Sequence, residues 1–208
     1  MSSTDGSGLV DVFMHGQILG GVDFDRPDLY CKWSLVTENP NWVLKNGVDH
    51  GTTQTDSPGV RLPPRRRLLS RANVPLSPAQ DFPPRIVWEH PVDVWYKTAG
   101  LRGWPALRLE VWQRDAHGRS VAVAYAVCAL PTTPGEVDLE CRTWAPVGTL
   151  RDQAFSAFMG NQPTLSDASA VLNEDTRKNL TTVASGTVHV RMAVLIRGLN
   201  DFPKVAQS

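Results

Sequence analysis

Hydrophobic and polar residues alternate with a period of two along most of this chain. The stretch 29–36 shows the pattern clearly, with one face made of Leu29, Cys31, Trp33 and Leu35. Successive side chains of a strand point to opposite faces, so this alternation predicts a half-buried β-strand. The same argument predicts strands at 9–18, 92–97, 107–112, 137–141 and 187–197, and a short edge strand at 52–55.

Residues 121–130 differ from these segments because they are apolar on both faces. We expect them to form a central strand that is covered on both sides. Turn residues separate the segments, as at Asp115–Gly118 and Pro134-Gly135, and Gly20-Gly21 is expected to close the first strand. Short strands with turns between them predict an all-β fold, an antiparallel β-sandwich of about eight strands.

Helix signals are scarce. Thr149 and Asp152 resemble a capping box, and Leu150, Ala154 and Phe158 share one helical face. Residues 167–181 are polar and are compatible with a helix or a loose loop. We therefore expect one or two short helices beside the sandwich.

Composition changes sharply between residues 58 and 85, where seven prolines and six arginines stand against a single acid, Asp81. Dense proline blocks both helices and sheet ladders, so 59–85 is expected to be a flexible insert. It interrupts a single domain spanning 9–202, between a disordered N-terminus (1–8) and a C-terminal tail (203–208). The candidate membrane or partner contacts in the insert are Arg61, Arg65, Arg66, Arg67 and Arg71.

Acidic and basic residues balance at 21 each, so no overall field attracts the chain to nucleic acid or membrane. The three cysteines, Cys31, Cys128 and Cys141, are odd in number and far apart. We expect no disulfide framework, which fits a reducing compartment. The N-terminus has no apolar signal region and no stretch approaches the ~20 apolar residues that cross a bilayer. A cytoplasmic protein is expected.

Motifs that carry chemistry are missing from the sequence. There is no phosphate-binding loop, no G-x-S-x-G and no C-x-x-C. His15 and His189 lie on predicted strands and are expected to be satisfied, partly buried groups, and Cys31 is expected to pack rather than react. These observations predict a protein that is not an enzyme and has no catalytic, metal or cofactor residues.

Seven tryptophans accompany the predicted strands, and most are expected to fill the core. Trp95 shares its strand face with Asp93 and Lys97, and Trp112 shares its face with Arg108 and Glu110. We expect Trp95 and Trp112 to lie nearest a surface. They are the candidate partner-binding residues, with packing under a loop as the alternative.

The order of several motifs resembles that of one known family. They include His15-Gly16-Gln17-Ile18, Leu29-Tyr30-Cys31-Lys32-Trp33, Trp88-x-His90-Pro91-x-Asp93, Gly103-Trp104-Pro105 and Gly186-Thr187-Val188. Over about 9–58 and 86–202 the chain is similar to the B-nine domain proteins of the ciliary transition zone. The nearest match is the second of the two short, single-domain members.

The resemblance implies a C-two-type β-sandwich and a non-enzymatic role in the Meckel-syndrome (tectonic-like) complex. That assembly supports cilium assembly and gates the entry of membrane proteins at the cilium base, in the transition zone or basal body. The implied partners are the other B-nine domain proteins, including the Meckel-syndrome type one protein. Nucleic acid is not expected as a partner.

Calcium binding and lipid binding are considered separately, because the C-two-type sandwich is the architecture of calcium- and phospholipid-binding domains. Calcium needs six to eight oxygen ligands, which Asp93 and Asp115 alone do not supply, so calcium binding is expected to be absent. The basic insert leaves open a stand-alone, peripheral lipid- or membrane-binding module as the alternative function. A solvated insert without a fixed partner is an equally good interpretation.

Overall fold

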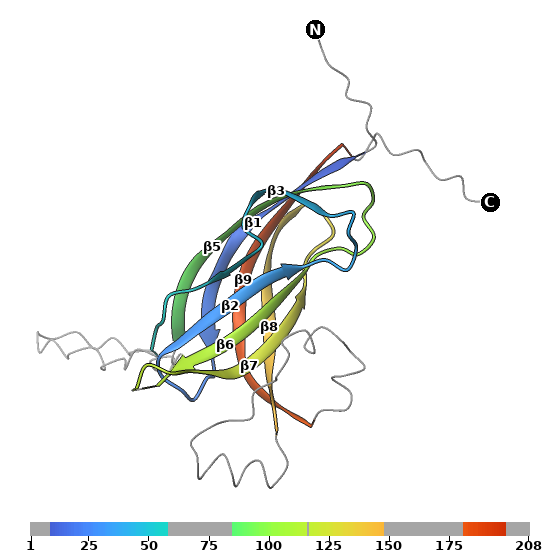
Figure 1. The fold of residues 1–208 in the computed structure, drawn as a ribbon. Helices are drawn as coiled ribbons and strands as arrows, with labels where there is room; N and C mark the ends of the chain where they lie inside the picture. The colour runs from blue at the N-terminus through green and yellow to red at the C-terminus, as the bar shows by residue number, and fades with distance from the viewer. Residues whose placement is uncertain (1–8, 58–84, 116, 148–180, 199–208) are drawn as a thin grey trace, which may run out of the picture.

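The computed structural model describes residues 9–57, 85–115, 117–147 and 181–198. These residues form nine strands and no helix, so none of them belongs to a helix that could cross a membrane (Figure 1). The strands are β1 (Val10–Val22), β2 (Leu29–Val36), β3 (Val43–Gly47), β4 (His50–Thr52), β5 (Arg85–Thr98), β6 (Ala106–Arg114), β7 (Ser120–Ala129), β8 (Gly135–Pro146) and β9 (Thr182–Arg197).

Several expectations fall on residues outside these ranges. They are the disordered N-terminus, almost all of the insert, the helix near 149–158, most of 167–181 and the C-terminal tail. The insert was expected to reach residue 85, but β5 already begins at Arg85.

The nine strands are joined in the order β3-β5-β1-β9-β8-β7-β6-β2-β4, and all the paired neighbours are antiparallel. The array folds over at β8, so that β2, β6 and β7 lie across from β5, β1 and β9 (Figure 1). The two layers meet at one register pair, Tyr125 with Trp144. The predicted antiparallel sandwich is confirmed, with nine strands in the described part rather than about eight.

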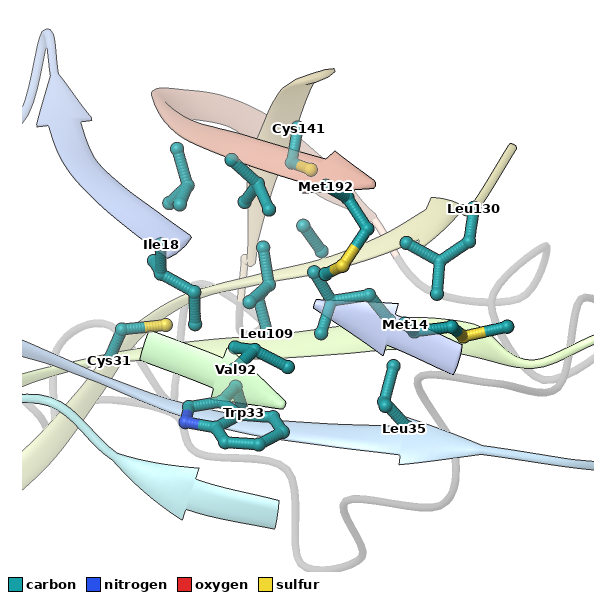
Figure 2. Packing of buried hydrophobic residues seen from close by; sticks show 14 of the residues in the cluster. Met14, Ile18, Cys31, Trp33, Leu35, Val92, Leu109, Leu130, Cys141 and Met192 are labelled. Carbon is teal, nitrogen blue, oxygen red and sulfur yellow. The ribbon is translucent and has the colours of Figure 1, made fainter. Parts of the chain in front are cut away.

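The inner faces of the two layers form one hydrophobic core. Trp33 and Leu35 of β2 point toward Met14 of β1 and Met192 of β9 (Figure 2). The alternation read along 29–36 is confirmed, since its apolar face is buried. Trp88 of β5 is 1% exposed, and its Nε1 donates a hydrogen bond to the backbone oxygen of Leu29 at 3.1 Å. One indole thereby links the two layers.

Several strands run further than the sequence predicted, and β1 and β5 show the physical reasons. β1 continues through Gly20-Gly21 to Val22, with a register shift after Ile18. A Cβ on Gly20 would lie 2.0 Å from the Ile86 carbonyl oxygen, so only glycine lets the bulged strand pass its neighbour. β5 begins well before residue 92 and contains Pro91, a position where β3 does not pair with it, so proline removes no ladder hydrogen bond on that side.

The expectation about the cysteines was wrong. Cys128 of β7 and Cys141 of β8 form a disulfide near the fold-over between the two layers. Chain reversal between the two strands brings the thiols together, which their spacing in the sequence did not reveal. Cys31 is free and buried, and burial raises the pKa of its thiol, in agreement with a packing role.

Candidate partner-binding faces

Trp95 lies on the outer face of the layer that contains β5, β1 and β9. The strand register places Trp95, Phe13 and Leu195 side by side in one row across these three strands. The rings of Phe13 and Trp95 are stacked, with centroids 5.5 Å apart and an interplanar angle of 18°. Leu195 is 54% exposed, so the row ends in an apolar side chain that faces solvent. We call these three residues the aromatic row.

A hydrogen bond holds the aromatic row in place. The Trp95 Nε1 donates to Asp11 Oδ1 at 3.0 Å, and Asp11 lies beside it on β1. The indole is therefore fixed by stacking on one side and by a polar partner at its edge. A ring that is already ordered loses little conformational entropy on contact, which is a property of interface anchors.

A shallow hollow of about 380 Å³ adjoins the aromatic row on the same face. Its lining includes the carboxylates of Asp93 and Glu136 and the side chains of His15 and Arg191. Gly16 also lines it, and a Cβ there would come within 2.1 Å of the Arg191 backbone oxygen. β1 and β9 thus approach each other closely beneath the hollow.

Arg191 is already engaged with two acids of β8. Its Nε lies 2.7 Å from Asp138 Oδ1 and 3.3 Å from Glu136 Oε1, and its Nη2 donates to Asp138 Oδ2 at 3.1 Å. These contacts with the guanidinium lower the pKa of Asp138 and raise that of Arg191. The charge of Arg191 is therefore shared between two carboxylates at this surface.

Trp112 lies on the opposite outer face, on β6. Lys32 Nζ stands 4.0 Å from the centroid of its ring, and its Nε1 donates to Glu110 Oε2 at 3.2 Å. Beside it, Tyr125 packs against Trp144 with centroids 5.5 Å apart, and Tyr125 is only 2% exposed. Trp112 thus belongs to a packed polar-aromatic cluster, whereas Trp95 belongs to a row that is open at one end.

A second hollow, of about 290 Å³, lies on the outer face of β6, β2 and β4. Lys32, His50 and Arg108 line it together with Glu110. Arg108 Nε lies 3.6 Å from Glu110 Oε1, so part of the positive charge is compensated.

The remaining candidate residues take structural positions. Asp115 Oδ1 accepts hydrogen bonds from the backbone N–H of His117 at 2.9 Å and of Arg119 at 2.8 Å, and Gly118 has φ +78°. The predicted turn is confirmed, and hydrogen bonding to Arg119 lowers the pKa of Asp115. His15 is exposed rather than partly buried. The five candidate arginines of the insert lie outside the described residues.

Among the described residues, no group of three or more His, Cys, Asp and Glu side chains could hold a metal ion.

The tryptophans divide into two sets. Trp33, Trp42 and Trp88 are buried, and the half-buried members are Trp95, Trp104, Trp112 and Trp144. Trp104 packs against the core together with the three buried rings, so the expectation that most tryptophans fill the core is confirmed.

Sequence reasoning missed Phe13 and Leu195 as surface residues. Both occupy outward positions of strands whose inward positions are apolar, such as Met14 and Val194. A large apolar side chain at the polar phase of an alternating strand was the available signal.

The two-layered antiparallel fold defines an all-β sandwich domain. Residues 12–195 match the B9-C2 family, described as "Ciliary basal body-associated, B9 protein". The mouse B9 domain-containing protein 2 is 35% identical over 194 residues, which cover 93% of this chain and 98% of that protein. The Xenopus laevis B9 domain-containing protein 1 is 27% identical over 198 residues, covering 90% of this chain and 89% of the relative.

The chain belongs to the B9 (B-nine) family of ciliary basal body-associated proteins. This membership confirms the resemblance seen in the motifs and the expected C-two-type sandwich. Among solved structures, a C-two domain of plant extended synaptotagmin 1 aligns with a TM-score of 0.40 and 11% identity, over 88% of this chain and 92% of that one. A likeness this distant bears on neither fold nor function.

Proposed function

We propose that the chain is a non-enzymatic scaffold subunit of the ciliary transition-zone Meckel-syndrome (tectonic-like) complex. In this role it acts in the cytoplasm at the cilium base, where it is needed for cilium assembly and for the membrane diffusion barrier. Membership of a ciliary basal body-associated family supports this role. So does the position of Trp95 and Trp112, which lie on the outer faces of the two layers.

The aromatic row carries the proposal. A stacked Phe13–Trp95 pair next to a solvent-facing Leu195 exposes apolar area that a partner could bury. Interfaces are enriched in aromatic side chains at their centre. Trp95 is therefore the primary candidate contact, and Trp112 remains a second one because its ring is half-exposed beside Lys32.

The proposed partners are other B9 proteins, including the Meckel-syndrome type one protein. Sandwich domains of one family present similar sheet faces and can associate through them. The similarity to the Xenopus B9 domain-containing protein 1 supports a set of related domains to which this chain belongs.

Imaging and affinity purification of the tagged chain in ciliated cells test the proposal. We expect a signal between basal body and axoneme, and co-purification of other B9 proteins. Trp95→Ala is expected to reduce that recovery, while Thr181→Ala, at an exposed position outside the strands, serves as the control. A diffuse cytosolic signal without recovery of any B9 protein would contradict the proposal.

We further propose that this function requires neither calcium nor another cofactor. Asp115 is committed to its turn through His117 and Arg119, which leaves its oxygens poorly placed for an ion. Isothermal titration of the purified chain is expected to give no heat of calcium binding. Saturable binding in the micromolar range would overturn this part.

A stand-alone, peripheral lipid-binding module is the second candidate function. The hollow lined by Lys32, His50 and Arg108 favours it, because basic side chains at a surface attract anionic headgroups. The arginines of the insert are the other candidate contacts. Sedimentation with anionic vesicles compares the intact chain, a 60–84 deletion and Lys32→Ala/Arg108→Ala. Failure of the intact chain to sediment without partners would reject this function.

A further inference from the structure

We infer that the outer face of β5, β1, β9 and β8 docks a partner segment that presents a basic side chain beside an apolar one. The inference rests on the proposed function, which places protein partners at sheet faces. It adds the chemistry of the segment that this face selects.

The apolar half of the docking surface is the aromatic row. Phe13 and Trp95 are held by stacking and by the hydrogen bond to Asp11, and Leu195 projects from the end of the row. Because the three side chains come from three different strands, the row is a rigid strip across the sheet. It offers contact to an apolar side chain without rearrangement of the backbone.

The charged half is the next row of side chains along the same strands. The register aligns Asp93, His15 and Ala193 across β5, β1 and β9, and then Glu136 on β8. Ala193 is the smallest side chain of this row, and the hollow of about 380 Å³ includes it. The carboxylates of Asp93 and Glu136 thus come from opposite flanks of one depression.

Charge counting in the depression favours a cationic occupant. Asp93 has no hydrogen-bond or ion-pair partner among the described residues, and Glu136 contacts only Arg191, at 3.3 Å. Arg191 is held more tightly by Asp138, at 2.7 Å. Glu136 and Asp138 therefore share one guanidinium, and Asp93 has no counter-charge among the described residues. An added lysine or arginine side chain would compensate the excess negative charge.

The separation of the two halves sets the spacing of the partner's side chains. Rows two residues apart along a strand are roughly 7 Å apart. An extended segment places its side chains i and i+2 on one face at that same separation. The face therefore matches a segment with a basic residue two positions from an apolar one, or three to four positions away if the segment is helical.

The test uses the full-length chain and, as probe, a purified B9 domain-containing protein 1 from the same organism. Binding is measured by biolayer interferometry for the wild type and for Asp93→Asn/Glu136→Gln. The matched control is Glu38→Gln, which removes an exposed carboxylate elsewhere on the surface. We expect the double variant to bind about tenfold more weakly and with a smaller dependence on salt, and the control to match the wild type.

A second measurement identifies the occupant directly. A carbodiimide couples carboxylates to nearby lysine amines, and mass spectrometry locates the joined residues. We expect cross-links from Asp93 or Glu136 to a partner lysine that lies near an apolar residue. Unchanged melting temperatures of the variants exclude misfolding as the cause of weaker binding.

The outcomes separate this inference from the proposed function. If the wild type binds no other B9 protein, the proposed function fails and the inference fails with it. If the wild type binds and the double variant binds equally well, only the inference is overturned. A wild-type dimer dissolved by the double substitution would make a second copy the occupant. That result would overturn the assignment of the face to another B9 protein.

Discussion

Trp88 and Trp95 belong to the same strand and face opposite sides of it. Trp88 is 1% exposed and joins β5 to Leu29 of the other layer, whereas Trp95 stacks on Phe13 at the outer surface. The same side chain therefore holds the sandwich together at one position and offers contact area at the other. The difference shows that tryptophan content alone does not separate packing from recognition, while the strand phase does.

The inner region is where the largest loss of stability is expected. Trp88→Ala leaves a cavity and removes the indole hydrogen bond to the Leu29 oxygen, which then accepts only from the Asp56 N–H. We therefore predict a loss of about 3–5 kcal/mol in the free energy of unfolding, mainly from the cavity. Urea denaturation followed by circular dichroism measures it. Trp88→Phe, which keeps part of the volume, is the control and loses less. A change below about 1 kcal/mol would remove the distinction between the two faces.

The disulfide is a covalent part of the inner region. Reduction of Cys128–Cys141 is predicted to lower the free energy of unfolding by about 3 kcal/mol, because it frees a closed loop in the unfolded chain. Alkylation of the denatured protein without reductant, followed by mass spectrometry, is expected to label one cysteine, Cys31. Labelling of all three would show that the thiols are not paired.

A substitution on the outer face is expected to weaken partner binding more than it lowers the stability of the fold. Trp95→Ala removes one ring stack, worth about 1 kcal/mol of stability, but it is predicted to weaken partner binding by about 2 kcal/mol. Urea denaturation and interferometry on the same variant compare the two effects. A variant that loses several kcal/mol of stability while binding normally would make Trp95 a core residue.

The smallest predicted effect is a pH dependence of stability that arises from His90. The ring of His90 lies beside that of Trp33, with their centroids 5.9 Å apart. Burial lowers the pKa of His90 below its ordinary 6.5, so the folded state takes up the proton less readily than the unfolded chain. Stability is therefore unaffected above pH 6.5 and falls as the pH drops from 6.5 toward the folded pKa.

Urea midpoints at pH 7.5 and 5.5 measure this dependence, and His90→Gln is expected to reduce it. Asp115 and Asp138 do not interfere in this window, because their pKa values are lowered from 3.8. Equal pH dependence in both proteins would show that another group is responsible.

Alternation along single strands was enough to predict much of the fold. The inward positions Val188, Val190, Met192 and Val194 of β9 are all buried, as the sequence indicated. This succeeded because the period of two depends only on the geometry of one strand. The continuation of β1 past Gly20 could not be predicted, since the bulge depends on the close approach of Ile86 from β5.

The candidate site was predictable only in part. The charged neighbours of Trp95 indicated an outward ring, but the aromatic row requires the pairing of β5, β1 and β9, which are distant in the sequence. The disulfide required the same knowledge of which strands become neighbours. Register is a tertiary property, and a single sequence carries little direct information about it.

Site-specific photo-crosslinking at Leu195 tests whether the outer face of β5, β1 and β9 contacts other B9 proteins in the cell. A benzoylphenylalanine replaces Leu195 in the full chain expressed in ciliated cells, and the same substitution at exposed Glu38, outside the strands, provides the reference position. We predict a light-dependent adduct with another B9 protein from position 195, and a much weaker one from position 38. Adducts of equal yield from both positions, or none from position 195 while the B9 proteins still co-purify, would contradict it.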